Sequence, residues 1–515
     1  MQRYPNVHHF LEHSAEVRCD SPAIVHGDKS WNYGEVEARS NRLANLLIGR
    51  GIEPGDRVAL LTDNGIEYIV GLFGILKAGA CVVALSNANK PRTNSKLLED
   101  SGAVALITRA LTVRRDLPDL IAGLKNLRLV VLDRAGPWLD PSGGVEVVAG
   151  QDLMVFPTLR PGLAIKPENL ALILYTSGST GMPRGVTLTH GNLTANTSQI
   201  LDYLKLTEKD SVLAVLPFHY SFGNSLLMTH FAVGGRLVLD NRFAYPQTIL
   251  ETMQSQAVTG FSGVPSTYAI LCAKTDFLEA PLPGLQYLTQ AGGAMAPSLI
   301  RRIHEAFHDR ARLFVMYGQT EASARLSYVP PEMLEQKLGS IGVPIPGVEL
   351  ELRSDDGRKC EVGEVGELVA RGENIMGGYW NDPEETRLVL RGGELFTGDL
   401  GRLDEDGYFF LVDRKKNMIK VGANRVSSRE VEDALVEIDG VVEACVVGAP
   451  DELLGEAIIA HVALHHDSQL DKKKIIAFLH KGLAQFKIPR KIIFHTELPK
   501  NSSGKVMKNY LKNIN

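Results

Sequence analysis

Short, almost entirely apolar runs recur along the chain and restrict its fold class. VALL at 58–61, CVVAL at 81–85, ALIT at 105–108 and LVVL at 129–132 have this character, and helical patterns alternate with such runs. A strand without a polar face has to be covered on both sides, as it is in a parallel sheet between helices. The alternation therefore predicts an α/β protein in which sheets and helices lie in layers.

The composition restricts the class of protein further. Of the 515 residues, 44% are hydrophobic and 22% are charged, which is typical of a globular protein and excludes disordered, collagen-like and coiled-coil chains. A chain of this length exceeds one compact domain. The formal net charge of −5 argues against a nucleic-acid partner held by a basic surface.

Three features bear on location. Residues 1–20 lack an apolar stretch behind a basic cluster, so we expect no secretory signal. The longest apolar run, 68–85, contains Lys77 and several glycines, which predicts a buried helix and a strand and no membrane span. The 5 cysteines are far apart and odd in number, which favours reduced thiols in a cytoplasmic enzyme.

The pattern of predicted strands and helices changes after about Gly398. Short strand and turn patterns give way to a smaller alternation that contains the helical segment 429–438 and the apolar segments 442–450 and 457–465. The charged stretch 413–417 between them has the composition of an exposed linker. We therefore expect a large domain over 1–413 and a small α+β domain over 417–515.

A segment rich in glycine and hydroxyl side chains directly follows the predicted strand 170–175. Its sequence, TSGSTGMPRG, would let successive backbone N–H groups point at one anion, with a forked cation at its end. It lacks the Gly-Lys-Ser/Thr ending of a Walker loop, which excludes ordinary P-loop NTPases. A surface turn is the alternative to phosphate binding, which we favour. The expected phosphate contacts are Thr176, Ser177, Gly178, Ser179, Thr180, Gly181 and Arg184.

Other polar segments also follow predicted strands, where open α/β sheets bind ligands. YGQTE at 317–321 offers an aromatic ring, a glycine, a hydroxyl and a carboxylate, and the small residues of QAGGAM at 290–295 would let a flat ring approach the backbone. Asp399 could accept hydrogen bonds from both hydroxyls of a ribose.

These segments, in this order, resemble the motifs of the adenylate-forming superfamily, which includes acyl- and aryl-CoA synthetases, luciferases and nonribosomal peptide adenylation domains. The likeness extends from about Ser30 to Leu511 and is closest to AMP-forming acyl-CoA synthetases. It implies a large N-terminal domain with a β-barrel-like subdomain, a hinge at 414–416 and a mobile C-terminal domain. Arg184 is a departure, because the family usually has lysine there.

The resemblance assigns roles to the nucleotide segments. It implies that Tyr317 stacks on adenine, that Thr320 bonds the α-phosphate and that Glu321 holds Mg²⁺, the only metal expected. The remaining ATP and AMP contacts that it implies are Gly292, Gly293, Ala294, Gly318, Gln319, Asp399 and Arg414.

The acid pocket is implied to include the segment PFHYSFG at 217–223. Its expected walls are Phe218, His219, Phe222 and Val264. His219 stands where amino-acid-activating relatives commonly carry an aspartate, and no acidic residue occurs at 211–239 to balance a buried ammonium. An aliphatic or aromatic acid is therefore expected, and an α-amino acid is not.

The C-terminal part carries the residues that the resemblance assigns to catalysis and transfer. Lys505 is implied to bridge the substrate carboxylate and the α-phosphate, since one compact cation can neutralise two anions that must meet. Lys416 is implied as the hinge pivot, and Gly422 and Ala423 as the border of the thiol tunnel.

The implied reaction has two steps. A carboxylic acid and MgATP give acyl-AMP and pyrophosphate, and a thiol, most often that of coenzyme A, then takes the acyl group. Loading of the phosphopantetheine arm of an acyl or peptidyl carrier protein is an alternative, a nucleotide-binding pseudoenzyme is a remote one, and the sequence allows a homodimer. From Asp471 to Asn515 there are 11 Lys/Arg and 2 Asp/Glu. Either this basic bias serves only solubility, or Lys481, Lys487, Arg490 and Lys491 meet an acidic thiol donor.

Overall fold

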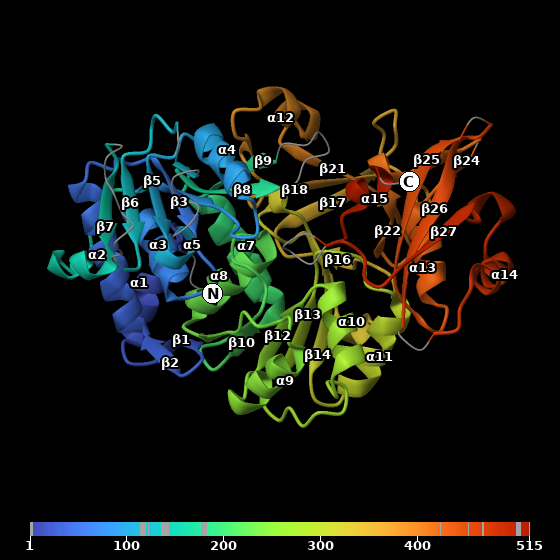
Figure 1. The fold of residues 1–515 in the computed structure, drawn as a ribbon, viewed down its shortest axis with the longest axis horizontal. Helices are drawn as coiled ribbons and strands as arrows, with labels where there is room; N and C mark the ends of the chain where they lie inside the picture. Colours follow the sequence, from blue (N-terminus) through green and yellow to red (C-terminus); the bar gives the residue numbers. More distant parts are fainter. Residues whose placement is uncertain are drawn as a thin grey trace.

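The computed structural model describes residues 4–113, 120–121, 123–134, 144–176, 183–422, 424–451, 453–465, 468–500 and 506–513. Figure 1 shows a large body of layered sheets and helices, with the C-terminal part, drawn in red, beside it. The predicted fold class is confirmed, since the molecule is a mixed α/β structure with a large N-terminal and a smaller C-terminal part.

A nine-stranded sheet carries several of the sequence motifs. Its central strands β11, β10, β12, β13 and β14 are parallel to one another, and antiparallel strands extend both edges. In spatial order its strands are β16 (Val343–Pro344), β15 (Ser327–Val329), β14 (Arg312–Tyr317), β13 (Tyr287–Gln290), β12 (Gly260–Gly263), β10 (Ser211–Ala214), β11 (Arg236–Leu239), β1 (Pro22–His26) and β2 (Lys29–Asn32).

An eight-stranded sheet contains the four apolar runs found in the sequence. They form neighbouring parallel strands whose residues are buried, except for half-buried Arg57 at the start of β3. In spatial order its strands are β19 (Gly378–Tyr379), β9 (Arg184–Thr189), β8 (Leu170–Thr176), β4 (Cys81–Ala84), β3 (Arg57–Leu61), β5 (Ala105–Thr108), β6 (Leu129–Leu132) and β7 (Glu146–Ala149).

Helices pack on both sheets, and the largest core cluster joins residues of α1–α3, α7 and α8 to strands of the two sheets. The helices of this part are α1 (His8–Val17), α2 (Tyr33–Gly49), α3 (Ile66–Lys77), α4 (Pro91–Ser101), α5 (Ala110–Val113), α7 (His190–Leu204), α8 (Ser221–Val233), α9 (Pro246–Ser255), α10 (Pro265–Lys274), α11 (Pro297–Phe307) and α12 (Pro383–Val389). The apolar run 68–85 forms most of α3 and then β4, as expected. In the described part of the chain, no helix is long and apolar enough to cross a membrane.

Two further sheets complete the molecule. The first contains β17 (Val348–Arg353), β18 (Gly366–Gly372), β21 (Glu394–Leu403), β20 (Leu390–Arg391) and β22 (Phe409–Arg414). The second, in the C-terminal part, contains β24 (Asn424–Val426), β23 (Ile419–Val421), β26 (Gly455–Leu464), β25 (Val441–Asp451) and β27 (Lys491–His495), with helices α13 (Ser428–Val436), α14 (Lys472–Gly482) and α15 (Lys508–Asn513). A 3₁₀ turn, Lys415–Asn417, connects the two sheets. The domain limits 1–413 and 417–515 stay a prediction.

Asp413 fastens the end of β22 to the start of α13. Its Oδ2 accepts hydrogen bonds from the Ser428 backbone N–H at 2.6 Å and from the Ser427 hydroxyl at 3.1 Å. The helix N-terminus is thereby capped from outside its own segment, which suits the partial positive charge there. The end of β22 is thus held against the first residues of α13 in the C-terminal part.

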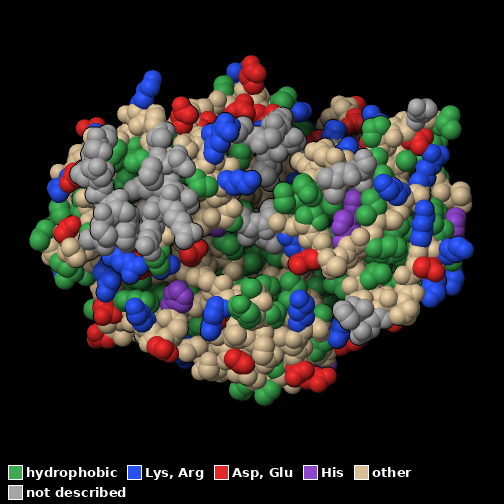
Figure 2. Space-filling view, viewed as in Figure 1, with side chains coloured by type: hydrophobic (Ala, Val, Ile, Leu, Met, Phe, Trp, Pro, Cys, Tyr) green, Lys and Arg blue, Asp and Glu red, His purple; other side chains and the backbone are tan. Residues whose placement is uncertain are grey.

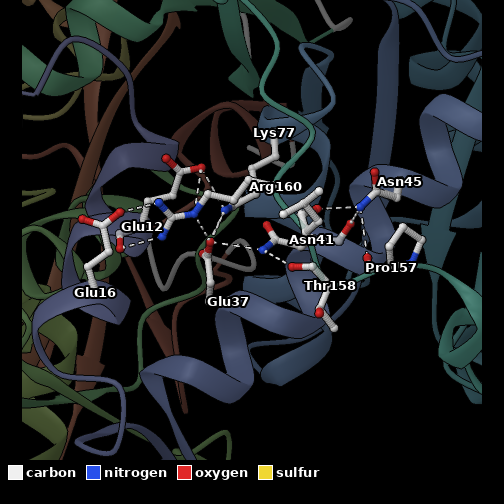
Figure 3. A network of polar contacts seen from close by, with 10 residues as sticks. Glu12, Glu16, Glu37, Asn41, Asn45, Lys77, Pro157, Thr158 and Arg160 are labelled. Atoms are coloured by element: carbon white, nitrogen blue, oxygen red, sulfur yellow. Dashed lines mark hydrogen bonds and ion pairs between the residues drawn. The ribbon is translucent and has the colours of Figure 1, made fainter.

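A buried ionic network joins the first three helices (Figure 3). The ammonium of Lys77, at the end of α3 and 1% exposed, lies 2.8 Å from Glu37 of α2 and 3.0 Å from Glu12 of α1. Arg160 reaches the same Glu37 at 2.7 Å and also pairs with Glu16. A buried ammonium is tolerated only with such partners, since leaving water costs it several kcal/mol.

The same network fixes the chain that leads to β8. Asn41 donates to the Thr158 carbonyl at 2.8 Å, and Asn45 donates to the Pro157 carbonyl at 3.0 Å (Figure 3). The segment 157–160 is thereby attached to the outer surface of α2.

We expect Lys77→Met to lower the free energy of unfolding by about 3 kcal/mol, because Glu12 and Glu37 lose a buried partner while Arg160 remains. Urea unfolding followed by circular dichroism measures the change. Lys29→Met, at an exposed lysine of β2, is the matched control and should leave the midpoint unchanged. Equal midpoints for the two variants would show that the network does not stabilise the fold.

Candidate active site

Four of the sequence motifs begin where parallel strands of the nine-stranded sheet end. Segment 217–223 follows β10, Val264 follows β12, segment 290–295 includes the end of β13, and segment 317–321 begins at the end of β14. Parallel strands present their carboxyl ends at one edge of a sheet, so the fold gathers these motifs along one edge.

The predicted phosphate loop connects two antiparallel strands of the other sheet. Thr176 at the end of β8 is opposite Arg184 at the start of β9. Ser177, Gly178, Ser179, Thr180 and Gly181 lie outside the described residues. The structure thus fixes both ends of the loop.

Asp399 is the most tightly held of the predicted nucleotide contacts. Its carboxylate accepts a hydrogen bond from the Tyr317 hydroxyl at 2.6 Å and another from Arg414 Nε at 2.8 Å. β21 and β22 pair with Asp399 opposite Arg414, which explains their closeness. Burial, followed by the Asp399 charge, raises the pKa of Tyr317, so the phenol keeps its proton and remains a donor.

The carboxylate of Glu321 is oriented by a residue that the sequence did not single out. The Tyr379 hydroxyl donates to Glu321 Oε1 at 2.8 Å, and the neighbouring Thr320 hydroxyl lies 3.3 Å from that of Ser221 at the start of α8. The other Glu321 oxygen has no hydrogen-bond partner among the described residues, so it is available as a metal ligand. A single carboxylate fits a cation such as Mg²⁺, which proteins bind with one or two carboxylates together with phosphates.

The turn that carries Glu321 has an unusual backbone. Ser323 has φ 59° and Ala324 has φ 139°, both in the region that favours glycine. A Cβ on Gly318 would lie 2.0 Å from the Ala324 carbonyl oxygen, so only glycine fits there. Backbone strain of this kind clusters at functional sites.

The small-residue segment lies against the predicted acid pocket. Gly292, Gly293 and Ala294 are exposed, and a Cβ on Gly292 would lie 3.1 Å from a methyl group of Val264. The side chain of Gln290 donates to the Gly293 carbonyl at 2.8 Å and holds the segment in place. The backbone of 292–294, which carries no large side chain, is therefore accessible to a ligand beside Val264.

The predicted pocket residues differ in their surroundings. Phe218 is fully buried, with its ring centre 5.5 Å from that of Tyr68. The His219 ring centre lies 4.5 Å from that of Tyr220, and His219 Nε2 is buried without a hydrogen-bond partner among the described residues. Burial lowers the pKa of His219 to about 4, so its imidazole is neutral at pH 7.

Phe222 covers a buried cation that the sequence reasoning missed. The guanidinium of Arg325 lies 4.1 Å from the centre of the Phe222 ring, and the residue is 2% exposed. No carboxylate pairs with it in the described part of the chain; it donates instead to the Ala324 carbonyl at 3.3 Å, the Met316 sulfur at 3.4 Å and the Ser225 hydroxyl at 3.5 Å. In the sequence, its position four residues after Glu321 could have indicated that Arg325 belongs to the site.

Arg184 is held by acidic residues of the segment around α12. Its Nη1 lies 2.5 Å from Glu385 Oε1, and its Nε lies 4.0 Å from Asp382 Oδ2. The guanidinium also lies 5.7 Å from the centre of the Tyr379 ring. The predicted phosphate-binding cation is therefore already paired within the chain.

Three predicted residues of the C-terminal part are described only in part or not at all. Lys505 and Ala423 lie outside the described residues, and of Lys416 only the backbone, in the 3₁₀ turn, is described. Gly422 is described, with φ 62°, and its N–H donates to the Leu454 carbonyl at 2.7 Å. The roles of these residues stay predictions.

One further group of side chains has the spacing of a metal site. His8, His9 and Glu12 of α1 are the one such group found in the described part of the chain. The ammonium of Lys77 lies 3.0 Å from Glu12, and the charges of Lys77 and Arg160 add to the burial that lowers the pKa of His8 to about 2. A cation at this group would face two fixed positive charges, which favours a purely structural role.

Comparison with known proteins assigns the family. Residues 11–380 match the model of the AMP-binding enzyme family, and residues 430–505 match the AMP-binding enzyme C-terminal domain. The chain therefore belongs to the AMP-binding enzyme family, as its motifs predicted.

Relatives of similar length share the whole chain. A feruloyl-CoA synthase of Amycolatopsis sp is 34% identical over 496 residues, covering 96% of each chain, and a long-chain-fatty-acid–CoA ligase of Salmonella typhimurium is 32% identical over 541 residues, covering 99% of this chain and 94% of the ligase. An anthranilate CoA ligase solved with anthranoyl-AMP superposes with a TM-score of 0.90 at 29% identity, covering 100% of this chain and 98% of that one. An o-succinylbenzoate CoA synthetase of Bacillus subtilis, in complex with its acyl-adenylate intermediate, has a TM-score of 0.85 at 27% identity, with 99% of both chains covered.

We expect the stability of the protein to fall as the pH drops from about 6.5 to about 4 because of His219. In the unfolded chain the imidazole takes up a proton near pH 6.5, whereas in the folded protein it stays neutral until about pH 4, so acid favours unfolding across this window. His219→Phe should lose about 2 kcal/mol less between pH 7 and pH 5 than the unchanged protein, measured by urea unfolding. His480→Phe, at an exposed histidine of α14, should keep the original pH dependence, and an identical dependence in all three proteins would contradict the assignment.

Proposed function

We propose that this chain is an AMP-forming acid–thiol ligase that activates a carboxylic acid with ATP and transfers the acyl group to coenzyme A. The observation that carries the proposal is the whole-length match to CoA ligases, together with the Tyr317–Asp399–Arg414 cluster at the end of β14. ATP and coenzyme A are substrates in this reaction, and pyrophosphate and AMP are released.

The nucleoside would bind at Asp399 and Tyr317. Asp399 is fixed on both oxygens by donors, so its orientation toward ribose hydroxyls requires no reorganisation when ATP arrives. The Tyr317 ring would stack on adenine, beside Gly318 and Gln319, while the exposed backbone of 292–294 lies against the other side of the base. The roles of these residues are part of the proposal.

The phosphates would bind between the loop that ends at Arg184 and the turn at Thr320. Thr320 would donate to the α-phosphate, and Glu321 would hold Mg²⁺, which neutralises phosphate charge when bound. Lys505 would complete the arrangement by approaching the carboxylate and the α-phosphate together. In-line attack of the carboxylate oxygen on the α-phosphorus then forms acyl-AMP, helped by positioning and charge neutralisation.

The acid is proposed to be an aliphatic or aromatic carboxylic acid and not an α-amino acid. His219 is neutral at pH 7, and strand β10, the segment 215–235 with α8 and the start of β11 carry no acidic side chain that would balance a substrate ammonium. Relatives named for feruloyl, anthranilate and long-chain fatty acids span both chemical types, so the proposal stays at this class.

Coenzyme A is the proposed acceptor, and a carrier protein is the alternative. Lys and Arg side chains gather along the right edge of Figure 2, over the C-terminal part. Lys487 pairs with Glu430 at 2.5 Å, and Arg490 pairs with Asp451, so their charges are balanced, whereas Lys481 and Lys491 are exposed. Two such cations suffice for the phosphates of coenzyme A, which supports the smaller acceptor.

Two finer points complete the proposal. All 5 cysteines are free thiols, which supports a reducing, cytoplasmic setting. A homodimer is compatible with the proposed reaction, which each chain would perform alone.

Exchange of labelled pyrophosphate into ATP, measured on a panel of aliphatic, aromatic and amino acids, tests the function. We expect exchange with at least one aliphatic or aromatic acid and none with α-amino acids. Lys505→Ala should abolish acyl-AMP formation while largely sparing thioester formation from supplied acyl-AMP, because Lys505 serves the first step only. Equal loss of both half-reactions would contradict two alternating domain positions, and the absence of exchange with every acid would contradict the ligase.

We expect Glu321→Gln to raise the Mg²⁺ concentration that the enzyme needs and to slow acyl-AMP formation about 100-fold, since a neutral amide binds the cation poorly. Tyr379→Phe keeps the carboxylate but removes the hydrogen bond that orients it, so a loss of about tenfold is expected. Acyl-AMP formation measured across a Mg²⁺ titration tests both variants. Unchanged activity of Glu321→Gln at saturating Mg²⁺ would exclude Glu321 as the metal carboxylate.

A further inference from the structure

We propose that Glu385 is a built-in counter-ion for Arg184, which the phosphates of ATP displace on binding and which returns as pyrophosphate leaves. This inference rests on the proposed function, because it gives Arg184 a phosphate partner. Glu385 would act as a positioning residue, since it touches Arg184 and not the reacting atoms.

The ion pair is short and partly shielded. Arg184 Nη1 lies 2.5 Å from Glu385 Oε1, and the two side chains are 19% and 24% exposed. Asp382 adds a second negative charge at 4.0 Å from Arg184 Nε. Charges at this depth attract each other more strongly than at an open surface, because less water screens them.

Glu385 is held in place by backbone contacts that do not involve Arg184. Its N–H donates to Asp382 Oδ1 at 3.0 Å, which caps α12. The Tyr379 N–H donates to the Thr386 hydroxyl at 2.9 Å, and β19 pairs with β9, the strand that begins with Arg184. Figure 1 shows α12 at the top of the molecule, beside β9. The backbone that carries Glu385 therefore keeps its place whether or not Arg184 is paired with the side chain, so the carboxylate stays within reach of Arg184.

Arg184 has room and donors to exchange partners. An open hollow of about 380 Å³ is lined by Arg184, Asp100, Trp380 and Asp382. A guanidinium carries five N–H donors, and the polyphosphate of ATP presents more negative charge than one carboxylate. The nucleotide can therefore take over Arg184 from Glu385.

The same exchange runs in reverse after the first step. Pyrophosphate remains at the loop when acyl-AMP has formed, and it must leave for the reaction to proceed. A neighbouring carboxylate that pairs with Arg184 again lowers the affinity for pyrophosphate and ATP alike. The Arg184–Glu385 pair thus lowers the affinity for ATP and also weakens inhibition by pyrophosphate.

The segment offers a matched pair of variants. Glu384 is adjacent in the first turn of α12, is exposed, and makes no ion pair with any described residue. Glu385→Gln removes the counter-ion, whereas Glu384→Gln removes the same charge one position away. We expect Glu385→Gln to lower the dissociation constants of MgATP and of Mg-pyrophosphate about three- to tenfold, and to strengthen product inhibition equally. Glu384→Gln should change them less than about twofold.

Calorimetric titration with MgATP and with Mg-pyrophosphate, in the absence of acid, measures the binding. The difference between the two variants should shrink as salt is added, because screening weakens the removed charge. In an Arg184→Met background, where binding is already weak, Glu385→Gln should have no effect, since its partner is gone. Thermal unfolding of each variant shows that the fold is kept.

The outcomes are distinct. The inference is overturned if Glu385→Gln binds like Glu384→Gln, if it binds more weakly, or if its effect persists in the Arg184→Met background. If the charge effect is found but no acid supports pyrophosphate exchange, the counter-ion stands and the proposed ligase activity falls. If neither MgATP nor Mg-pyrophosphate binds the unchanged protein, both fall.

Discussion

One buried carboxylate joins the parts of this molecule that have to act together. Asp399 belongs to the antiparallel sheet of β17–β22, yet its carboxylate accepts a hydrogen bond from Tyr317 at the end of β14 in the nine-stranded sheet. Its other oxygen accepts from Arg414, the last residue before the 3₁₀ turn that leads to the C-terminal part. A carboxylate at 5% exposure is stable only because both donors are present, so the two sheets and the connection are fixed relative to one another.

Charged groups of the site are paired within the chain before any ligand arrives. Arg414 has Asp399, Arg184 has Glu385, and the carboxylate of Glu321 has the Tyr379 hydroxyl. Because both partners are already held in position, a ligand that displaces one of them meets the other correctly oriented, at the cost of breaking the existing pair. Arg325 differs, because it is buried against Phe222 without a carboxylate among the described residues, and the aromatic face and weak acceptors are its compensation.

The rigidity that such pairs need comes in part from residues that are distant in the sequence from those they hold. The Lys77 network holds the segment 157–160, which precedes β8 in the chain. The strained turn after Glu321 is held by Asn374, which donates to the Ala322 carbonyl at 3.1 Å and to the Arg325 carbonyl at 3.0 Å. Asn196 donates to the same Arg325 carbonyl at 3.0 Å. Backbone that is locked from several sides can keep φ values that would otherwise relax.

The sequence by itself determined the fold class, the family and the strand-end motifs, because each depends on a local pattern. Apolar runs without a polar face require a covered sheet, and the chemistry of 176–185 or 317–321 is contained in a few consecutive residues. Only the tertiary structure decided the partners of those motifs. Tyr379 and Glu385 come to Glu321 and Arg184 through the pairing of β9 with β19, whose members Thr187 and Gly378 are 191 residues apart. A contact of that range depends on strand register and on the packing of the whole sheet, which no local pattern records.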